Sequence, residues 1–195
     1  METVETTATR TFLTPEEYLA RERKALDKSE YRDGQIYTMP GASRKHNLIT
    51  ANTLAELHVQ LRNRICEVYS SDMRVKVSST GRYTYPDVVV VCEEPHFEDS
   101  HFDTLLNPTV LIEVLSPSTA AYDRGDKFAS YQKLDSLCEY VLISQDNVCV
   151  EHYLREGQTW DLTEFRSFND MFSLVSINCE LSLQAIYAKV QFSQE

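Results

Sequence analysis

The chain has 195 residues, of which 42% are apolar and 25% are charged, so a buried core is feasible and disorder of the whole chain is excluded. No apolar run approaches the roughly 18 to 20 residues that cross a bilayer, and the first ten residues form no apolar signal region. We therefore expect a cytoplasmic protein with no membrane partner. A formal net charge of −11 opposes a nucleic-acid partner unless the acidic residues lie away from a locally basic groove.

The first half of the chain alternates between helical and strand-like segments. Thr14-Pro15 is a strong helix start, Asp33-Gly34 is a typical hairpin turn, and Ser43 can cap a long helix. The elements predicted here are a helix over 15–28, two short strands within 31–37, a helix over 44–64, and strands over 66–69 and 73–77.

Two β-branched runs, 86–91 and 110–115, follow a polar loop around Gly81. Continuous apolar strands indicate burial on both faces, and hence a central sheet that is covered by helices. The remaining predicted elements are a helix over 123–137, strands over 139–143, 148–154 and 160–165, and a short closing helix over 182–189. This order predicts an α/β domain with a mixed sheet.

The five cysteines are scattered along the chain, with no C-x-x-C pair; they are Cys66, Cys92, Cys138, Cys149 and Cys179. An odd number of cysteines without an export signal argues against a disulfide framework and against a cysteine-based zinc site. We expect them to be small buried hydrophobic residues.

Two acids occupy apolar strand segments. Asp87 opens a run of four valines, and Glu113 lies among Val, Leu and Ile. A carboxylate beside a sheet core is costly unless it is paired, hydrogen-bonded or bound to a metal. Acids on two neighbouring buried strands can share one cation, and Mg²⁺ prefers a few carboxylates plus waters. The alternative is that each acid lies in solvent at the end of a strand.

Asp123, Lys127 and Tyr131 are spaced four residues apart, so they form one stripe on a helix. A lysine in this stripe can stabilise an attacking hydroxide or the negative charge on a phosphate. The alternative is an ordinary surface pair between Asp123 and Lys127, worth about 0.3 to 0.5 kcal/mol.

Three segments in this order resemble the Uma-type family of restriction-endonuclease-like proteins, within the PD-(D/E)XK nuclease superfamily. They are Tyr85-Pro86-Asp87 with its valines, Pro108-x-x-Leu111-Ile112-Glu113-Val114-Leu115-Ser116-Pro117, and Asp123-Arg124-x-x-Lys127-x-x-x-Tyr131. Two earlier segments extend the resemblance, Glu30-Tyr31-x-Asp33-Gly34 and Ser43-x-x-His46-Asn47. The resemblance covers residues from about 12 to about 190.

The resemblance implies a restriction-endonuclease-like core, a central mixed β-sheet flanked by helices, as one nuclease-like domain over 12–190 behind a flexible N-terminus at 1–11. It implies that Asp87 and Glu113 bind Mg²⁺, or alternatively Mn²⁺, with the backbone carbonyl of Val114 as a further ligand. Lys127 would be the signature lysine, displaced to a helix because the usual strand position holds Leu115. Glu30 would be an additional acid at the site. Its alternative is an exposed residue at a helix end.

Three further residues are candidates for substrate binding. His46, at a helix start after two basic residues, either contacts a phosphate or belongs to a solvated first turn. Arg124 either contacts a phosphate or pairs with Asp123 or Asp126. The third candidate for substrate binding is Tyr131, the last residue of the helical stripe. A serine nucleophile is not favoured, because no Ser-His-Asp arrangement can be argued from spacing.

The leading hypothesis is metal-dependent hydrolysis of DNA phosphodiester bonds. That the substrate is DNA is implied by the resemblance to the family. A homodimer, common among such nucleases, would let two sites cut two strands. The rival is a non-cleaving DNA-binding or regulatory protein that keeps the nuclease fold. The acidic net charge and the lack of a dense basic patch speak against cleavage of DNA and give this rival weight. A metal-dependent hydrolase of another phosphoester would share the same site.

Overall fold

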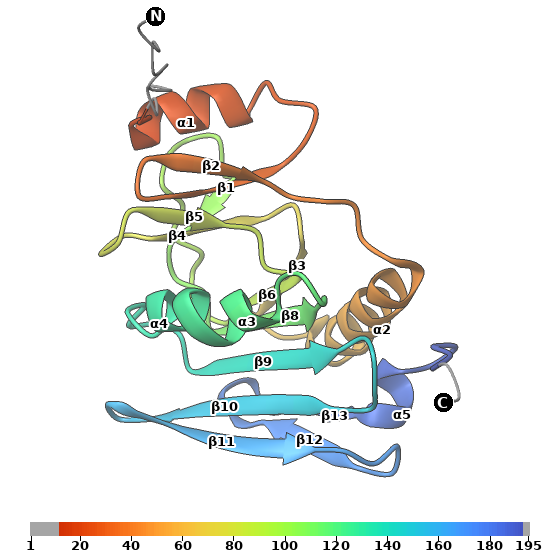
Figure 1. Cartoon of the computed structure of the whole chain (residues 1–195). Helices are drawn as coiled ribbons and strands as arrows, with labels where there is room; N and C mark the ends of the chain where they lie inside the picture. The colour runs from red at the N-terminus through yellow and green to blue at the C-terminus, as the bar shows by residue number, and fades with distance from the viewer. Residues whose placement is uncertain (1–11, 193–195) are drawn as a thin grey trace, which may run out of the picture.

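The computed structural model describes residues 12–192, so the flexible N-terminus predicted for residues 1–11 lies outside the described residues. The chain builds two mixed sheets and a short two-stranded one (Figure 1). The elements are α1 (Pro15–Glu22), β1 (Ser29–Arg32), β2 (Gln35–Thr38), α2 (Arg44–Leu61), β3 (Glu67–Ser70), β4 (Arg74–Val77), β5 (Arg82–Thr84), β6 (Val88–Val91), β7 (Thr104–Leu105), β8 (Val110–Leu115), α3 (Ala120–Tyr122), the π-helical η1 (Asp123–Lys127), α4 (Phe128–Tyr131), β9 (Glu139–Ser144), β10 (Val150–Glu156), β11 (Thr159–Phe165), β12 (Met171–Leu174), the 3₁₀ turn η2 (Val175–Ile177), β13 (Cys179–Ser182) and α5 (Leu183–Ile186).

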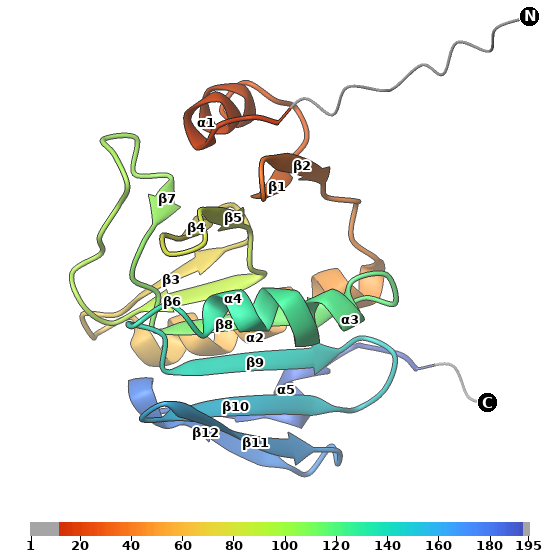
Figure 2. The same ribbon diagram turned by 60° about the vertical axis from the view of Figure 1, so that its left-hand side comes forward.

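The larger sheet has six strands in the order β11-β10-β9-β8-β6-β3. Strands β8 and β9 run parallel and the other neighbours run antiparallel, so the sheet is mixed. Every residue of β6 and β8 is buried, as their continuous apolar sequences predict. Helix α2 covers one face of this sheet and the α3–η1–α4 segment covers the other (Figure 2). The predicted central mixed sheet flanked by helices is confirmed.

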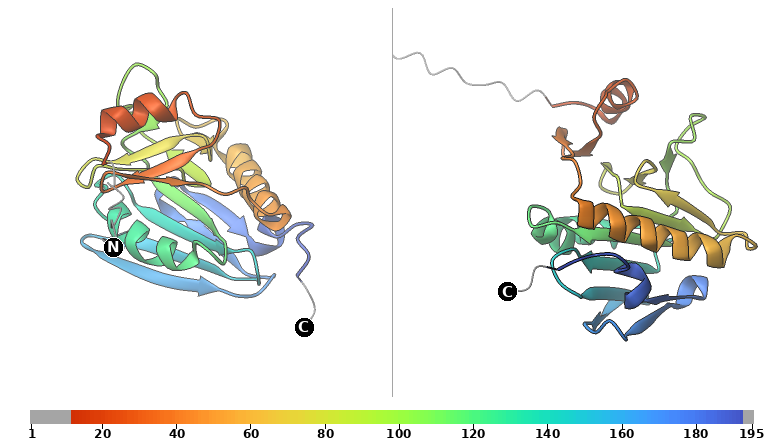
Figure 3. Two further views of the ribbon diagram at one scale, coloured as in Figure 1. Left: turned by 45° about the horizontal axis from the view of Figure 1, so that its top comes forward. Right: turned by 90° about the vertical axis from the view of Figure 1, so that its right-hand side faces the viewer.

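Side chains alternate between the two faces of these central strands. Val88, Val90 and Ile112 pack with residues of α2, and Figure 3 shows this helix lying across the strands. Val89 and Leu111 point the other way and pack with Phe128 and Tyr131 of α4. By the same alternation, Asp87 and Glu113 belong to the face that α4 covers.

The second sheet has five strands in the order β2-β1-β5-β4-β7 and lies above the larger sheet in Figure 1. The β1–β2 hairpin turns at Asp33 and Gly34, both with positive φ, as the Asp-Gly pair predicts. One face of the hairpin is apolar, since Tyr31 packs with Tyr18 of α1 and with Tyr83 of β5. The opposite face of β1 carries Glu30 and Arg32.

Several predicted boundaries and strands differ from the structure. The first helix ends at Glu22 rather than near residue 28, and the helix predicted over 123–137 is a run of three short segments over 120–131. Strands β5, β7, β12 and β13 were not predicted. They have only two to four residues, which is too short for a period-two pattern to emerge from one sequence.

The expectation of five unpaired cysteines is wrong for Cys66 and Cys92, which form a disulfide. The cause is strand register: Glu67 of β3 lies opposite Val91 of β6, and the next residues outward are the two cysteines. Cysteine number and spacing give no information on register. Cys138 is half-buried and free, and Cys149 and Cys179 are buried and free, as expected.

Candidate active site

The two predicted acids meet on one face of the six-stranded sheet. Val88 of β6 lies opposite Ile112 of β8, and one further step of this antiparallel register places Asp87 opposite Glu113. Directly opposed residues have Cβ atoms about 4.5 to 5.5 Å apart. Both side chains are largely buried, with 13% of Asp87 and 6% of Glu113 exposed. The prediction that these acids come together from neighbouring buried strands is confirmed.

Asp87 is held from two sides through its Oδ2 atom. The backbone N–H of Val114 donates a hydrogen bond to it at 2.7 Å, and His46 Nε2 lies 3.2 Å away. The structure thus brings His46 to the site, from the first turn of α2 that Ser43 caps. Among the described residues, Oδ1 of Asp87 accepts no hydrogen bond, so this carboxylate has one oxygen available for a ligand.

Glu113 is also held through a single oxygen. Lys127 Nζ lies 2.8 Å from Oε1, and the Tyr131 hydroxyl donates a hydrogen bond to the same oxygen at 3.0 Å. The Tyr131 hydroxyl oxygen also lies 2.9 Å from Thr84 Oγ1, whose own hydroxyl can donate to it. No side chain between residues 12 and 192 donates a hydrogen bond to Glu113 Oε2, so the second carboxylate likewise keeps one oxygen available.

Lys127 connects acids from three parts of the chain. Besides Glu113, its Nζ lies 3.0 Å from Glu30 Oε1 on β1 and 3.4 Å from Asp123 Oδ1 on the same helical segment. The helical stripe of Asp123, Lys127 and Tyr131 is confirmed, because all three side chains are buried against the acids. Glu30 is a buried strand residue and not an exposed helix end, and its Oε2 accepts a hydrogen bond from the Tyr122 hydroxyl at 3.2 Å.

The acids outnumber the cation in this cluster. Burial raises the pKa of Glu113 well above its ordinary value, and Lys127 offsets this only in part. Burial likewise raises the pKa of Asp123. Burial opposes the charged form of Lys127, but the surrounding acids, Glu113 first, outweigh it and raise the lysine pKa. The cluster therefore favours a bound cation and keeps Lys127 protonated.

The donor set fits a hard cation such as Mg²⁺. Within the described part of the chain, no group of three His, Cys, Asp or Glu side chains is arranged to hold a metal ion. Mg²⁺ does not need such a cage, because it usually binds one or two carboxylates and keeps several waters. Asp87 and Glu113, each with one available oxygen, match this mode. The Val114 carbonyl stays a predicted ligand, whereas its N–H has the observed role of fixing Asp87.

Two predicted substrate contacts have other partners. Tyr131 has no exposed surface and bonds to Glu113 and Thr84, so the prediction that it touches substrate is wrong and its role is to position Glu113. Arg124 turns to Glu151 on β10, with Nε 3.0 Å from both carboxylate oxygens and Nη2 2.5 Å from Oε1. The expected pairing of Arg124 with Asp123 or Asp126 is therefore wrong, and its contact with a phosphate stays a prediction.

Two contributors to this site were missed by sequence reasoning. Tyr122 bonds to Glu30 but lies one residue before the helical stripe, where spacing gives no signal. Arg32 follows Glu30 by two residues, and this period-two spacing on a strand was a usable signal for a shared face.

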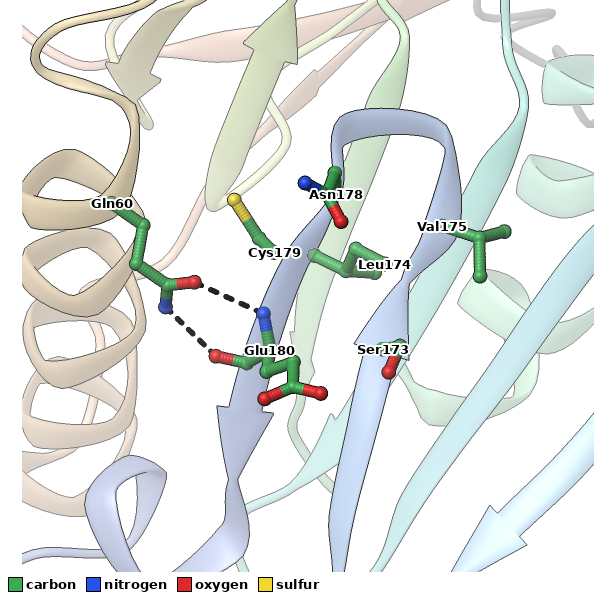
Figure 4. Close-up of a pocket in the computed structure, with 7 residues that line it drawn as sticks. All are labelled: Gln60, Ser173, Leu174, Val175, Asn178, Cys179 and Glu180. Carbon is green, nitrogen blue, oxygen red and sulfur yellow. Dashed lines mark hydrogen bonds between the residues drawn. The ribbon is translucent and has the colours of Figure 1, made fainter.

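A pocket of about 450 Å³ lies elsewhere, between α2 and the β12–β13 hairpin (Figure 4). The Gln60 amide bonds to the backbone of Glu180 there, donating to its carbonyl and accepting from its N–H. None of the acids around Lys127 lines this pocket, so we assign it to the packing of α2 on the hairpin.

The mixed sheet, its two covering helices and the opposed acids define a restriction-endonuclease-like protein. The chain belongs to the Uma2 family, described as "Putative restriction endonuclease", whose family model matches residues 15–185. Within the described residues, no helix has the length and apolar character to cross a membrane.

Two related proteins and one crystal structure are similar to this chain. In Synechocystis sp. (strain ATCC 27184 / PCC 6803 / Kazusa), the uncharacterized protein sll1609 is 42% identical over 163 residues, covering 83% of this chain and 92% of that protein. The uncharacterized protein slr1290 of the same organism is 36% identical over 181 residues, covering 92% and 94%. A crystal structure described as "a putative nuclease belonging to DUF820" from Anabaena variabilis ATCC 29413 superposes with a TM-score of 0.76 at 20% identity, covering 92% of this chain and 99% of that one. The family and this fold together support a nuclease-like function.

Proposed function

We propose that this chain is a metal-dependent endonuclease that hydrolyses DNA phosphodiester bonds. The observation that carries the proposal is the pair of opposed acids, Asp87 and Glu113, with the Lys127 ammonium 2.8 Å from Glu113. Two carboxylates, each with an available oxygen, beside a buried ammonium are the groups that a phosphoryl site needs: ligands for a metal and a fixed positive charge.

Asp87, Glu113 and the Val114 carbonyl would hold Mg²⁺, with Mn²⁺ as the alternative metal. When bound, the metal supplies a water of lowered pKa and polarises the phosphate. The Val114 N–H and Tyr131 orient the two carboxylates. Lys127 stabilises negative charge on the phosphate, and Glu30 holds its Nζ in place at 3.0 Å. His46, next to Asp87, is placed to bind a phosphate oxygen or to carry a proton.

The proposed partner is DNA, and the proposed place of action is the cytoplasm. A homodimer would bring two such sites to the two strands of a duplex. The second candidate function is DNA binding or regulation without cleavage. The net charge of −11 opposes a nucleic-acid ligand and therefore favours the regulatory form of this alternative. The ion pairing of Lys127, which already compensates part of the charge of Glu113 and Glu30, also favours a protein without cleavage.

The test is cleavage of supercoiled plasmid with Mg²⁺ or Mn²⁺ by the wild-type chain and three near-isosteric variants, Asp87→Asn, Glu113→Gln and Lys127→Met. We expect metal-dependent nicking by the wild-type chain and a loss of at least a hundredfold in each variant, because each removes a metal ligand or the fixed charge. Asp126→Asn is the matched control, since Asp126 neighbours Lys127 but has an exposed side chain. Circular dichroism checks that every variant is folded.

A folded wild-type chain that leaves plasmid intact with both metals, while still binding DNA, would support the non-cleaving alternative. Nicking that persists in Asp87→Asn and Glu113→Gln would come from another source and would contradict the proposed site.

A further inference from the structure

The polar face of the β1–β2 hairpin forms a wall beside the acids. Glu30 and Arg32 are two residues apart on β1, so their side chains share a face. Tyr37 lies opposite Glu30 on β2, and Gln35 lies opposite Arg32. The Tyr37 hydroxyl donates to Gln35 Oε1, which keeps both β2 side chains on this face. Since Glu30 contacts Lys127, the face that carries Arg32 adjoins the candidate active site.

Arg32 is held between two aromatic rings. Its guanidinium carbon lies 3.9 Å from the centroid of the Tyr37 ring and 4.6 Å from that of Tyr122. Tyr122 donates its hydroxyl to Glu30, and Lys127 Nζ lies 5.8 Å from its ring centroid. The arginine is thus fixed against a residue that belongs to the acidic cluster. Stacking restricts the plane of a guanidinium while leaving its N–H edge able to donate.

The charge of Arg32 is not neutralised by the protein. Two other arginines that are partly or fully buried face acids: Arg23 pairs with Asp99 and Asp103, and Arg74 pairs with Asp103. Within residues 12–192, Arg32 forms no salt bridge, and its polar neighbours are the hydroxyls of Tyr37 and Tyr122, which carry no charge. Its neighbour Asp33 faces Arg82, at 3.5 Å, and Glu30 faces Lys127. A half-buried guanidinium that no acid of the described chain faces suits a ligand that brings its own negative charge.

We propose that Arg32 binds a backbone phosphate of the DNA. This phosphate would be a neighbour of the one that lies at Asp87 and Glu113. This inference rests on the proposed function, because it takes DNA as the ligand of the site. Arginine matches phosphate through two parallel N–H···O bonds, and its rigid placement between Tyr37 and Tyr122 lowers the entropy lost on binding. It also gives an acidic protein a local positive charge beside its active site.

The test measures binding of a short, labelled DNA duplex with Ca²⁺ in place of Mg²⁺, over a range of salt concentrations. We expect Arg32→Gln to weaken binding about tenfold and to reduce the slope of log Kd against log salt by about 0.9, the loss of one phosphate contact. Arg32→Lys should be intermediate, because an ammonium keeps the charge without the planar fork. Arg62→Gln, an exposed charge change at the far end of α2, should leave the affinity and the slope unchanged.

Equal affinity and equal salt slope in wild type and Arg32→Gln would overturn the assignment. So would a lower melting temperature in both Arg32 variants without a change in slope, which would make the arginine a clamp between hairpin and helix. If the wild type binds DNA through Arg32 but never cleaves it, the endonuclease proposal fails and the Arg32 assignment stands. A wild-type chain that binds no duplex at all contradicts both.

Discussion

At the scale of single residues, the site depends on the ammonium group of Lys127, which three carboxylates share. Lys127 Nζ contacts Glu113, Glu30 and Asp123, which come from β8, β1 and η1. Burial, and then repulsion within this surplus of acids, raises the pKa of Glu113 and of Asp123. A divalent cation at Glu113 and Asp87 would relieve this surplus, so ligand binding and the protonation state of the cluster are linked.

Tyr131 offers a test of positioning at this scale. Tyr131→Phe removes the hydrogen bonds to Glu113 Oε1 and Thr84 Oγ1, and should cost about 1 kcal/mol of unfolding free energy. Since Glu113 loses a donor that favours its charged form, we also expect the Mg²⁺ concentration for half-maximal cleavage to rise, with KM for DNA little changed. Metal titration of the cleavage rate measures this.

Tyr153→Phe is the matched control, because Tyr153 packs in the same aromatic cluster while its hydroxyl faces Glu151. A stability loss in Tyr131→Phe without any shift in the metal titration would leave the tyrosine a purely structural role.

At the scale of elements, the sequence was most informative where apolar runs were long. The segments now seen as β6, β8, β9 and α2 were all predicted, because burial on one or two faces leaves a strong pattern. Strands β5 and β7 have only three and two residues, which is too short to leave such a pattern. The same holds for the site. Asp87, Glu113 and Lys127 were found by their setting and order, whereas Tyr122 and Arg32 join them through packing of the hairpin on the helix.

A disulfide joins the end of β6 to the start of β3, and its contribution to stability can be tested. It closes a loop with a sequence separation of 26 residues, for which loop-closure entropy predicts about 3 kcal/mol of stabilisation. We expect Cys92→Ser to lose about this much unfolding free energy, measured by urea denaturation. Reductant should destabilise the wild type to the same extent and leave Cys92→Ser unaffected.

Cys138→Ser serves as the control, because Cys138 is free and half-buried. It should respond to reductant as the wild type does. A wild-type chain whose stability is indifferent to reductant would contradict the disulfide.

At the scale of the whole molecule, an ionic network ties α1 to the five-stranded sheet. Arg23, just after α1, bonds to Asp103 and Asp99 at 2.8 Å, and Arg74 of β4 lies 2.9 Å from Asp103. Arg23, with help from Arg74, holds the pKa of Asp103 well below its ordinary value of 3.8. A carboxyl whose pKa is lowered on folding stabilises the folded state above its unfolded pKa and loses that contribution as pH falls.

We therefore expect Asp103→Asn to be less stable than the wild type at pH 6, and the difference to shrink as pH falls below about 4. Urea denaturation between pH 6 and pH 3 measures it, with the exposed Asp146→Asn as control. A difference that stays constant over this range would show that the ion pairs contribute nothing to stability, as surface pairs often do.

The β1–β2 hairpin is joined to the rest of the site through side chains, Glu30 with Lys127 and Arg32 with Tyr122. Asp87, Glu113 and Lys127 come from the six-stranded sheet and the helix packed on it. The register of the two acids is therefore independent of the hairpin, whereas the position of the Lys127 ammonium is not. A small movement of this one hairpin would change the fixed charge at the site and leave the two carboxylates where they are.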